Sequence, residues 1–234
     1  MSGYSRSLLA CFVALAAAAC SDSATSPNSS RELAASNRPS LTLSPNSVFA
    51  GDRTVTFDVT AAGGTFNIGG MYAVTFPANS VCDPNTSGYG PGTWDTSCTT
   101  LAAGQSVTIT ATYGFQFGGP VVDFSPALRF NPNTNVTISS GLYAPLLTAF
   151  RSYWLANPSS LHWLGIYYTP DLGQTLITDG AFDSSLRTHV NLTTGIIWRR
   201  VKHFSGYNLA TGQPCTPSPD DPDCVDDGGP IIEQ

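Results

Sequence analysis

The residues best suited to chemistry in this chain are His203 and Ser205, which flank Phe204. Residues two apart on a β-strand point to the same face, so the imidazole and the hydroxyl can be neighbours. Histidine accepts protons near neutral pH, and a serine hydroxyl that it deprotonates can attack a carbonyl carbon. Attack on the Phe204 carbonyl would turn the Phe204–Ser205 peptide bond into an ester that water then opens. The alternative is structural, with His203 at a strand end and Ser205 in a turn.

Two aromatic residues, Tyr89 and Trp94, lie in a segment rich in Gly and Pro between Cys82 and Cys98. We expect such a segment to be a surface loop, and surface loops on a rigid scaffold often carry binding residues. Exposed aromatic side chains in a loop of this kind are typical of a contact surface for a sugar or a protein. The sequence therefore marks Tyr89 and Trp94 as candidate ligand-binding residues.

The N-terminal segment has the layout of a secretory signal that ends in a lipidation site. An apolar run at residues 8–19 is shorter than the ~20 residues needed to cross a bilayer. It ends in Ala17-Ala18-Ala19-Cys20, which resembles a bacterial lipobox, so we expect removal of residues 1–19 and lipidation of Cys20. Ordinary signal cleavage with an incidental Cys20 is the alternative. Residues 20–39 are small and polar and predict a flexible tether. The expected location is the bacterial cell envelope, lipid-anchored and either periplasmic or surface-exposed.

Four cysteines remain after the N-terminal segment, and they form two close pairs, Cys82/Cys98 and Cys215/Cys224. An even number of cysteines in an exported chain indicates disulfides. Three connectivities are open, and we favour the local pairing because each pair brackets a loop rich in turn-forming residues. There is no Cys-x-x-Cys motif, and the three histidines are not grouped with cysteines, so we expect no metal site and no cofactor.

The composition restricts the classes of function. Charged residues make up 11% of the chain and the formal net charge is -6, which argues against nucleic acid as a partner. Glutamate occurs only at Glu32 and Glu233, outside the expected folded domain, which excludes a glycosidase-type glutamate pair there. The sequence has no Gly-x-Ser-x-Gly nucleophile motif and no phosphate-binding glycine loop. The membrane, through the lipid anchor, and an unidentified protein or glycan remain as partners.

Alternation of apolar and polar residues dominates the chain after residue 50 and predicts β-strands. The expected strands cover residues 53–60, 72–76, 106–112, 135–139, 161–168, 186–192 and 196–201. Clusters of turn-forming residues separate them, which is typical of an antiparallel β-sandwich. Residues 145–156 have helical spacing and predict one short helix that covers an edge or end of the sheets. We expect this all-β domain at residues 40–212, followed by an irregular, acidic, Pro/Asp-rich tail at 213–234.

Several segments resemble the ZU-five domain, the β-sandwich found in zonula occludens proteins, ankyrins and netrin receptors. Gly63-Gly64-Thr65-Phe66 with residues 72–81 resembles its opening strands, residues 164–173 its middle hairpin, and residues 201–207 its final strand. The resemblance implies a sandwich over about residues 60–210. Some relatives of that domain cut themselves between Phe and Ser of a His-Phe-Ser triplet, so the resemblance also implies a scissile bond between Phe204 and Ser205.

These features together predict a non-enzymatic interaction or structural module of a cell-envelope lipoprotein. A carbohydrate-binding or adhesion module that uses the aromatic loop between Cys82 and Cys98 is the alternative. Self-cleavage at Phe204–Ser205, as a single turnover, can accompany either function.

Overall fold

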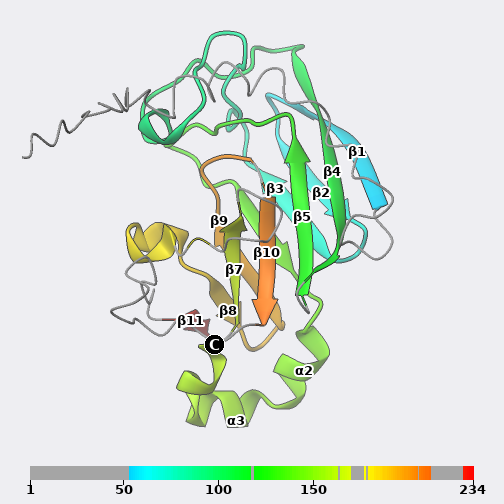
Figure 1. The fold of residues 1–234 in the computed structure, drawn as a ribbon, viewed down its shortest axis with the longest axis vertical. Coiled ribbons are helices and arrows are strands. Elements are labelled where there is room, and N and C mark those ends of the chain that lie inside the picture. The colour runs from blue at the N-terminus through cyan, green and yellow to red at the C-terminus, as the bar shows by residue number, and fades with distance from the viewer. Residues whose placement is uncertain are drawn as a thin grey trace, which may run out of the picture.

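The computed structural model describes residues 53–116, 119–162, 164–169, 177, 179–204, 206–211 and 229–234, which form two β-sheets packed face to face (Figure 1). The first sheet has the order β1 (Arg53–Thr60), β4 (Ser106–Gln116), β5 (Gly119–Ser125), β10 (Gly206–Thr211) and β7 (Leu164–Thr169). The second has the order β11 (Ile231–Glu233), β8 (His189–Asn191), β9 (Ile196–Arg200), β6 (Thr137–Ser140), β3 (Tyr72–Phe76) and β2 (Gly64–Ile68). Among these strands only β11 and β8 pair in parallel. The predicted β-sandwich is confirmed.

Alternating side chains place the core between the two sheets. In β3, Tyr72, Val74 and Phe76 are buried, whereas the two residues between them are partly exposed. The ladder between β1 and β4 sets Phe57 opposite Ile109. Branched and aromatic side chains are favoured on a pleated, half-buried surface, and their removal from water drives the packing of the sheets.

Two strands begin with glycine at positions where the sequence predicts only turns. β2 starts at Gly64 and β5 at Gly119. In the first case the turn ends one residue earlier, at Gly63, whose φ is +73°. A Cβ on Gly63 would lie 2.1 Å from the carbonyl oxygen of Phe76, so only glycine fits. Gly64 already pairs with Phe76 in the ladder between β2 and β3.

The helix predicted at 145–156 is divided into α2 (Ala144–Ala149) and α3 (Arg151–Ala156). Phe150 between them has a φ of -106° and a ψ of 23°, outside the α-helical range, and its side chain is exposed. The expected apolar face is only partly buried: Leu147 is buried, whereas Leu146 and Phe150 are exposed. Both helices lie at the opposite end of the sandwich from the long loop between β3 and β4 (Figure 1).

The last residues of the chain belong to the second sheet, although the sequence predicts an irregular tail up to the C-terminus. β11 pairs with β8, with Ile231 opposite His189. The Glu233 carboxylate lies 2.9 Å from His189 Nδ1 and accepts a hydrogen bond of 3.3 Å from Trp198 Nε1. The prediction that Glu233 lies outside the folded domain is therefore wrong.

Candidate functional site

The segment between Cys82 and Cys98 is closed by a disulfide, and we call it the disulfide loop. The Cα atoms of the two cysteines are 5.7 Å apart. The loop contains one short 3₁₀ turn, η1 (Pro91–Thr93), directly before Trp94. The local pairing predicted for these two cysteines is confirmed. The other predicted pair, Cys215 and Cys224, lies outside the described residues.

A buried arginine from another part of the chain holds the disulfide loop. Arg129 donates hydrogen bonds from its guanidinium to the backbone carbonyls of Thr93, Thr96 and Ser97. Burial lowers the pKa of Arg129, but a guanidinium remains protonated across the pH range of folded proteins. These three carbonyl groups thus receive charged donors, which make stronger hydrogen bonds than neutral ones. Nothing in the sequence spacing marks this role for Arg129.

The disulfide loop brings its two aromatic residues onto His203. The Trp94 ring stacks on the imidazole with ring centroids 3.8 Å apart, and Tyr168 of β7 contacts it edge-on at 4.8 Å. The Tyr89 hydroxyl lies 3.4 Å from His203 Nδ1 and donates a hydrogen bond of 2.8 Å to the carbonyl oxygen of Phe204. Tyr89 and Trp94 of the loop and His203 and Phe204 of the motif, predicted separately, therefore form one site.

Residues 201–204 are part of a crossover from one sheet to the other. β9 ends at Arg200 in the second sheet, and β10 begins at Gly206 in the first. The single final strand expected at residues 201–207 is thus replaced by this crossover and the start of β10. Ser205 lies outside the described residues, so the expectation that it shares a strand face with His203 has no support here.

Phe204 anchors the crossover in the core. Its fully buried ring stacks on Phe124 with centroids 4.0 Å apart. It also meets Phe76 and Phe130 edge to face, at 5.5 and 4.8 Å. Ring contacts of this geometry add to the free energy gained from burial alone. They also fix the position of the Phe204 carbonyl, which accepts the hydrogen bond from Tyr89.

Burial makes His203 a neutral and weakly basic side chain. It is 3% exposed, and burial, with the positive charges of Arg199 and Lys202, lowers the pKa of His203 to about 3. A base with so low a pKa has little capacity to take a hydroxyl proton at neutral pH. The Tyr89 hydroxyl, by contrast, is placed where negative charge would develop if the Phe204 carbonyl were attacked.

A pocket of about 450 Å³ lies beside this cluster, and we call it the aromatic pocket. Part of its lining comes from the 3₁₀ turns η3 (Asp179–Ala181) and η4 (Ser184–Leu186) and the residues between them. Its walls include the side chains of Trp94, Tyr168, Phe182, Leu186 and His203. Phe182 is 81% exposed, more than any other large apolar residue in the described part of the chain. The pocket is therefore largely apolar and has an open aromatic side chain at its boundary.

The charged residues at the aromatic pocket already have partners. Lys202 Nζ lies 2.5 Å from Asp95 Oδ1 and 2.6 Å from Asp183 Oδ2. Asp179 accepts hydrogen bonds from the buried guanidinium of Arg199 at 2.7 and 2.8 Å. Each of these charges has a partner of opposite sign, and because Lys202 is shared by two carboxylates the group carries one net negative charge.

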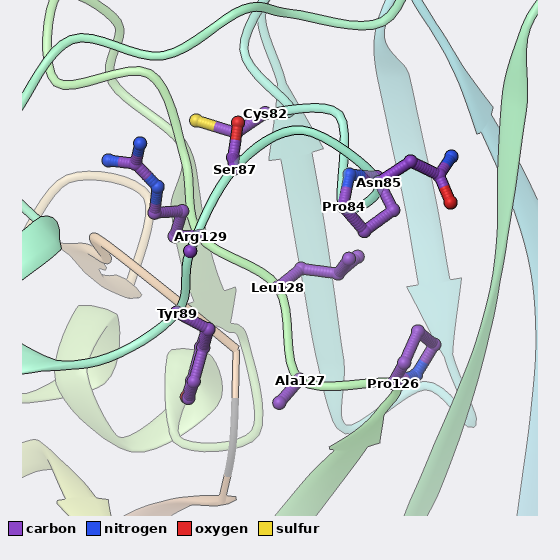
Figure 2. Close-up of a pocket in the computed structure, with 10 residues that line it drawn as sticks. Cys82, Pro84, Asn85, Ser87, Tyr89, Pro126, Ala127, Leu128 and Arg129 are labelled. Carbon is purple, nitrogen blue, oxygen red and sulfur yellow. The ribbon is translucent and has the colours of Figure 1, made fainter. Parts of the chain in front are cut away.

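A second pocket, of about 310 Å³, lies under the disulfide loop (Figure 2). Tyr89 forms one side of it, and Pro126 and Ala127, which follow β5, form another. The guanidinium of Arg129 points away from Pro126, on the side of Cys82 (Figure 2). The loop is held at its disulfide, at Arg129, at Lys202 through Asp95 and at its aromatic residues, and a pocket lies beside Tyr89.

Comparisons with protein-family models, with curated proteins and with solved structures give no match. Within the described residues, no group of three or more His, Cys, Asp or Glu side chains is arranged to hold a metal ion. In the same part of the chain, no helix has the length and apolarity needed to cross a bilayer. The function must therefore be argued from the geometry of the site itself.

Proposed function

We propose that the chain is a cell-envelope lipoprotein whose β-sandwich is a non-enzymatic interaction module. The observation that carries the proposal is the exposed ring of Phe182 at the edge of the aromatic pocket. Protein contact sites commonly combine an apolar pocket with a few aromatic anchors that supply most of the binding energy. His203, the histidine that lines this pocket, is neutral and weakly basic, which favours binding over turnover.

The proposed location rests on the sequence and agrees with the chemistry of the domain. Lipidation of Cys20 and a tether at residues 20–39 would hold the sandwich at a membrane; both lie outside the described residues. A disulfide between Cys82 and Cys98 is typical of proteins in oxidising compartments such as the bacterial periplasm or cell surface. Two packed sheets support the proposed relation to ZU-five domains at the level of fold class.

Carbohydrate binding by the disulfide loop is less well supported by the geometry. A sugar needs an open aromatic face, yet one face of Trp94 is covered by His203. The Tyr89 hydroxyl is already bonded to the Phe204 carbonyl, and both loop aromatics are only partly exposed. We therefore assign Tyr89 and Trp94 first to holding the loop on the domain.

Photo-crosslinking in cells tests the proposed function. A photoreactive phenylalanine analogue replaces Phe182 in the full chain and, as a matched control, replaces Thr56, which is exposed on β1. We expect an adduct with an envelope component in the membrane fraction from position 182 and not from position 56. Mass spectrometry should find diacylglyceryl on Cys20, and Cys20→Ser should release the chain from membranes. Equal crosslinking at both positions, or an unlipidated N-terminus, would contradict the proposal.

Self-cleavage between Phe204 and Ser205 is a second candidate, and the contact from Tyr89 to the Phe204 carbonyl oxygen favours it. We propose that Ser205 Oγ attacks the Phe204 carbonyl carbon while Tyr89 stabilises the charge on its oxygen. The C–N bond then breaks as the hydroxyl proton passes to the leaving nitrogen, which gives an ester. Water opens the ester and leaves a carboxylate on Phe204 and a free amine on Ser205.

Purified mature protein is expected to separate into two bands under denaturing conditions, the smaller one beginning at Ser205. Ser205→Ala should abolish the fragments because no nucleophile remains, while Ser205→Cys should retain part of the reaction. Tyr89→Phe should slow fragment formation by roughly 100-fold, the effect of removing one donor to an oxyanion. A single intact wild-type band after days at neutral pH would refute self-cleavage and leave the interaction module unaffected.

A further inference from the structure

We infer that the aromatic pocket binds an uncharged aromatic ring that carries a hydrogen-bond donor, such as the phenol of a tyrosine side chain. The inference rests on the proposed interaction module and specifies what enters it. The pocket volume of about 450 Å³ lies within the ~300–1,000 Å³ usual for ligand sites, so a single ring with its attachment fits. Three features of the pocket carry the inference: its walls, its charges and the acceptor nitrogen of His203.

The walls favour a flat ring. Trp94, Tyr168 and Phe182 line the pocket, and the imidazole of His203 is a fourth ring system there. Trp94 and Tyr168 meet edge to face, with centroids 6.4 Å apart and an interplanar angle of 89°. Aromatic rings prefer edge-to-face and offset-stacked contacts, so a further ring would add to this arrangement. It would also cover Phe182, whose ring is otherwise in water.

The charges at the pocket favour an uncharged ligand. Lys202 is shared between the carboxylates of Asp95 and Asp183, and Asp179 is bound by Arg199. An anionic ligand would meet the net negative charge of this group, and a cationic ligand would have to compete with Lys202 for Asp95 or Asp183. Both kinds of charged ligand carry a desolvation penalty that a neutral ring avoids.

Two nitrogen atoms of the lining have no hydrogen-bond partner in the described part of the chain: the buried Nε1 of Trp94, which is a donor, and Nε2 of His203. Tyr89 donates its single hydroxyl proton to the Phe204 carbonyl, so the Tyr89 oxygen can only accept a hydrogen bond from His203 Nδ1. We therefore assign the proton of the neutral imidazole to Nδ1. Nε2 of the neutral ring is then an acceptor. It makes no hydrogen bond to any residue in the described part of the chain, although His203 is almost completely buried. A ligand O–H or N–H that reached Nε2 would give this acceptor a donor that the described part of the protein does not supply.

Two capped amino acids that differ by one hydroxyl test the inference on purified, disulfide-bonded mature protein. We expect N-acetyl-tyrosinamide to bind roughly tenfold more tightly than N-acetyl-phenylalaninamide, the fold-change of one additional hydrogen bond. Saturation-transfer NMR and titrations measure the affinities, and only the tyrosine probe should shift the ¹⁵N resonance of His203 Nε2. A third arm uses p-cresol. Binding of p-cresol as tight as that of capped tyrosine indicates a free phenol as the ligand, and weaker binding indicates a polypeptide.

Two variants check that the preference arises in the pocket. His203→Phe keeps a ring and removes the acceptor, so the two probes should bind equally. Phe182→Ser, at an exposed position, should weaken both probes and leave folding unchanged. If the wild type binds the tyrosine and phenylalanine probes with equal affinity, the inference is overturned without either variant. It is also overturned if the wild type binds methyl glycosides and neither probe.

The outcome of the probe titrations is separate from that of the crosslinking experiment. A specific adduct at position 182 without binding of either ring probe retains the interaction module and refutes the ring ligand. Binding of a ring probe without an adduct at position 182 refutes the proposed envelope partner. The inference that the pocket binds an aromatic ring then still stands.

Discussion

Acidification is expected to destabilise this protein through His203. The pKa of an unfolded histidine is near 6.5, and burial lowers the pKa of His203 to about 3 in the folded protein. Between these values the unfolded chain binds a proton that the folded protein does not bind. The free energy of unfolding should therefore fall by about 1.4 kcal/mol per pH unit as the pH decreases from 6.5, and by about 4–5 kcal/mol in all near pH 3. Above pH 6.5 this contribution is complete.

Urea denaturation at a series of pH values, from about pH 7 to about pH 4, measures this dependence. The matched control is His203→Gln, which cannot titrate but can still hydrogen-bond to the Tyr89 hydroxyl. His162, His189 and all carboxylates are present in both proteins, so the difference between the two curves isolates His203. The variant should lose less stability than the wild type on acidification. Parallel curves would show that His203 is not the group that titrates.

The strands could be predicted where alternation runs without interruption. β1, β3 and β9 lie at or near their predicted bounds because each alternates branched or aromatic residues with polar ones. Two strands, β2 and β5, were missed because glycine, which usually marks a turn, also begins each of them. β11 was missed because three residues after a Pro/Asp run are too few to show a period.

The candidate site was predictable by residue type and not by arrangement. Tyr89, Trp94 and His203 were each identified from motif or composition, but their contact depends on the path of a loop that Arg129 holds from 30 or more residues away. Sequence also cannot show how deeply a histidine is buried, and burial moves the pKa of His203 away from neutrality. Phe182 lies in a segment without periodic pattern, so neither its exposure nor its pocket could be anticipated.

Removing the disulfide is expected to affect both stability and the site. Cys82→Ala with Cys98→Ala removes a cross-link between residues 16 apart in the sequence. By the chain-entropy relation, a cross-link of this length stabilises the folded protein by about 3 kcal/mol. A further loss arises at Arg129, whose buried guanidinium would lose its carbonyl acceptors if the loop moved away. We expect the free energy of unfolding to fall by at least about 3 kcal/mol in urea denaturation at neutral pH. Trp94, which is partly exposed in the wild type, should become more accessible to a fluorescence quencher in the folded variant.

The matched control is Cys215→Ala with Cys224→Ala, the cysteine pair predicted for the C-terminal tail. The Cys82–Cys98 bond fixes the loop that carries Trp94 and the carbonyl acceptors of Arg129. Removing this bond should therefore lower the free energy of unfolding by more than removing the control pair does. Adding Arg129→Met to each alanine pair separates the two causes. If the loop has already left the guanidinium, this change should be less destabilising without the Cys82–Cys98 bond than in the control pair. Equal costs of Arg129→Met in both backgrounds would mean that the disulfide acts only on the unfolded chain and that Arg129 holds the loop unaided.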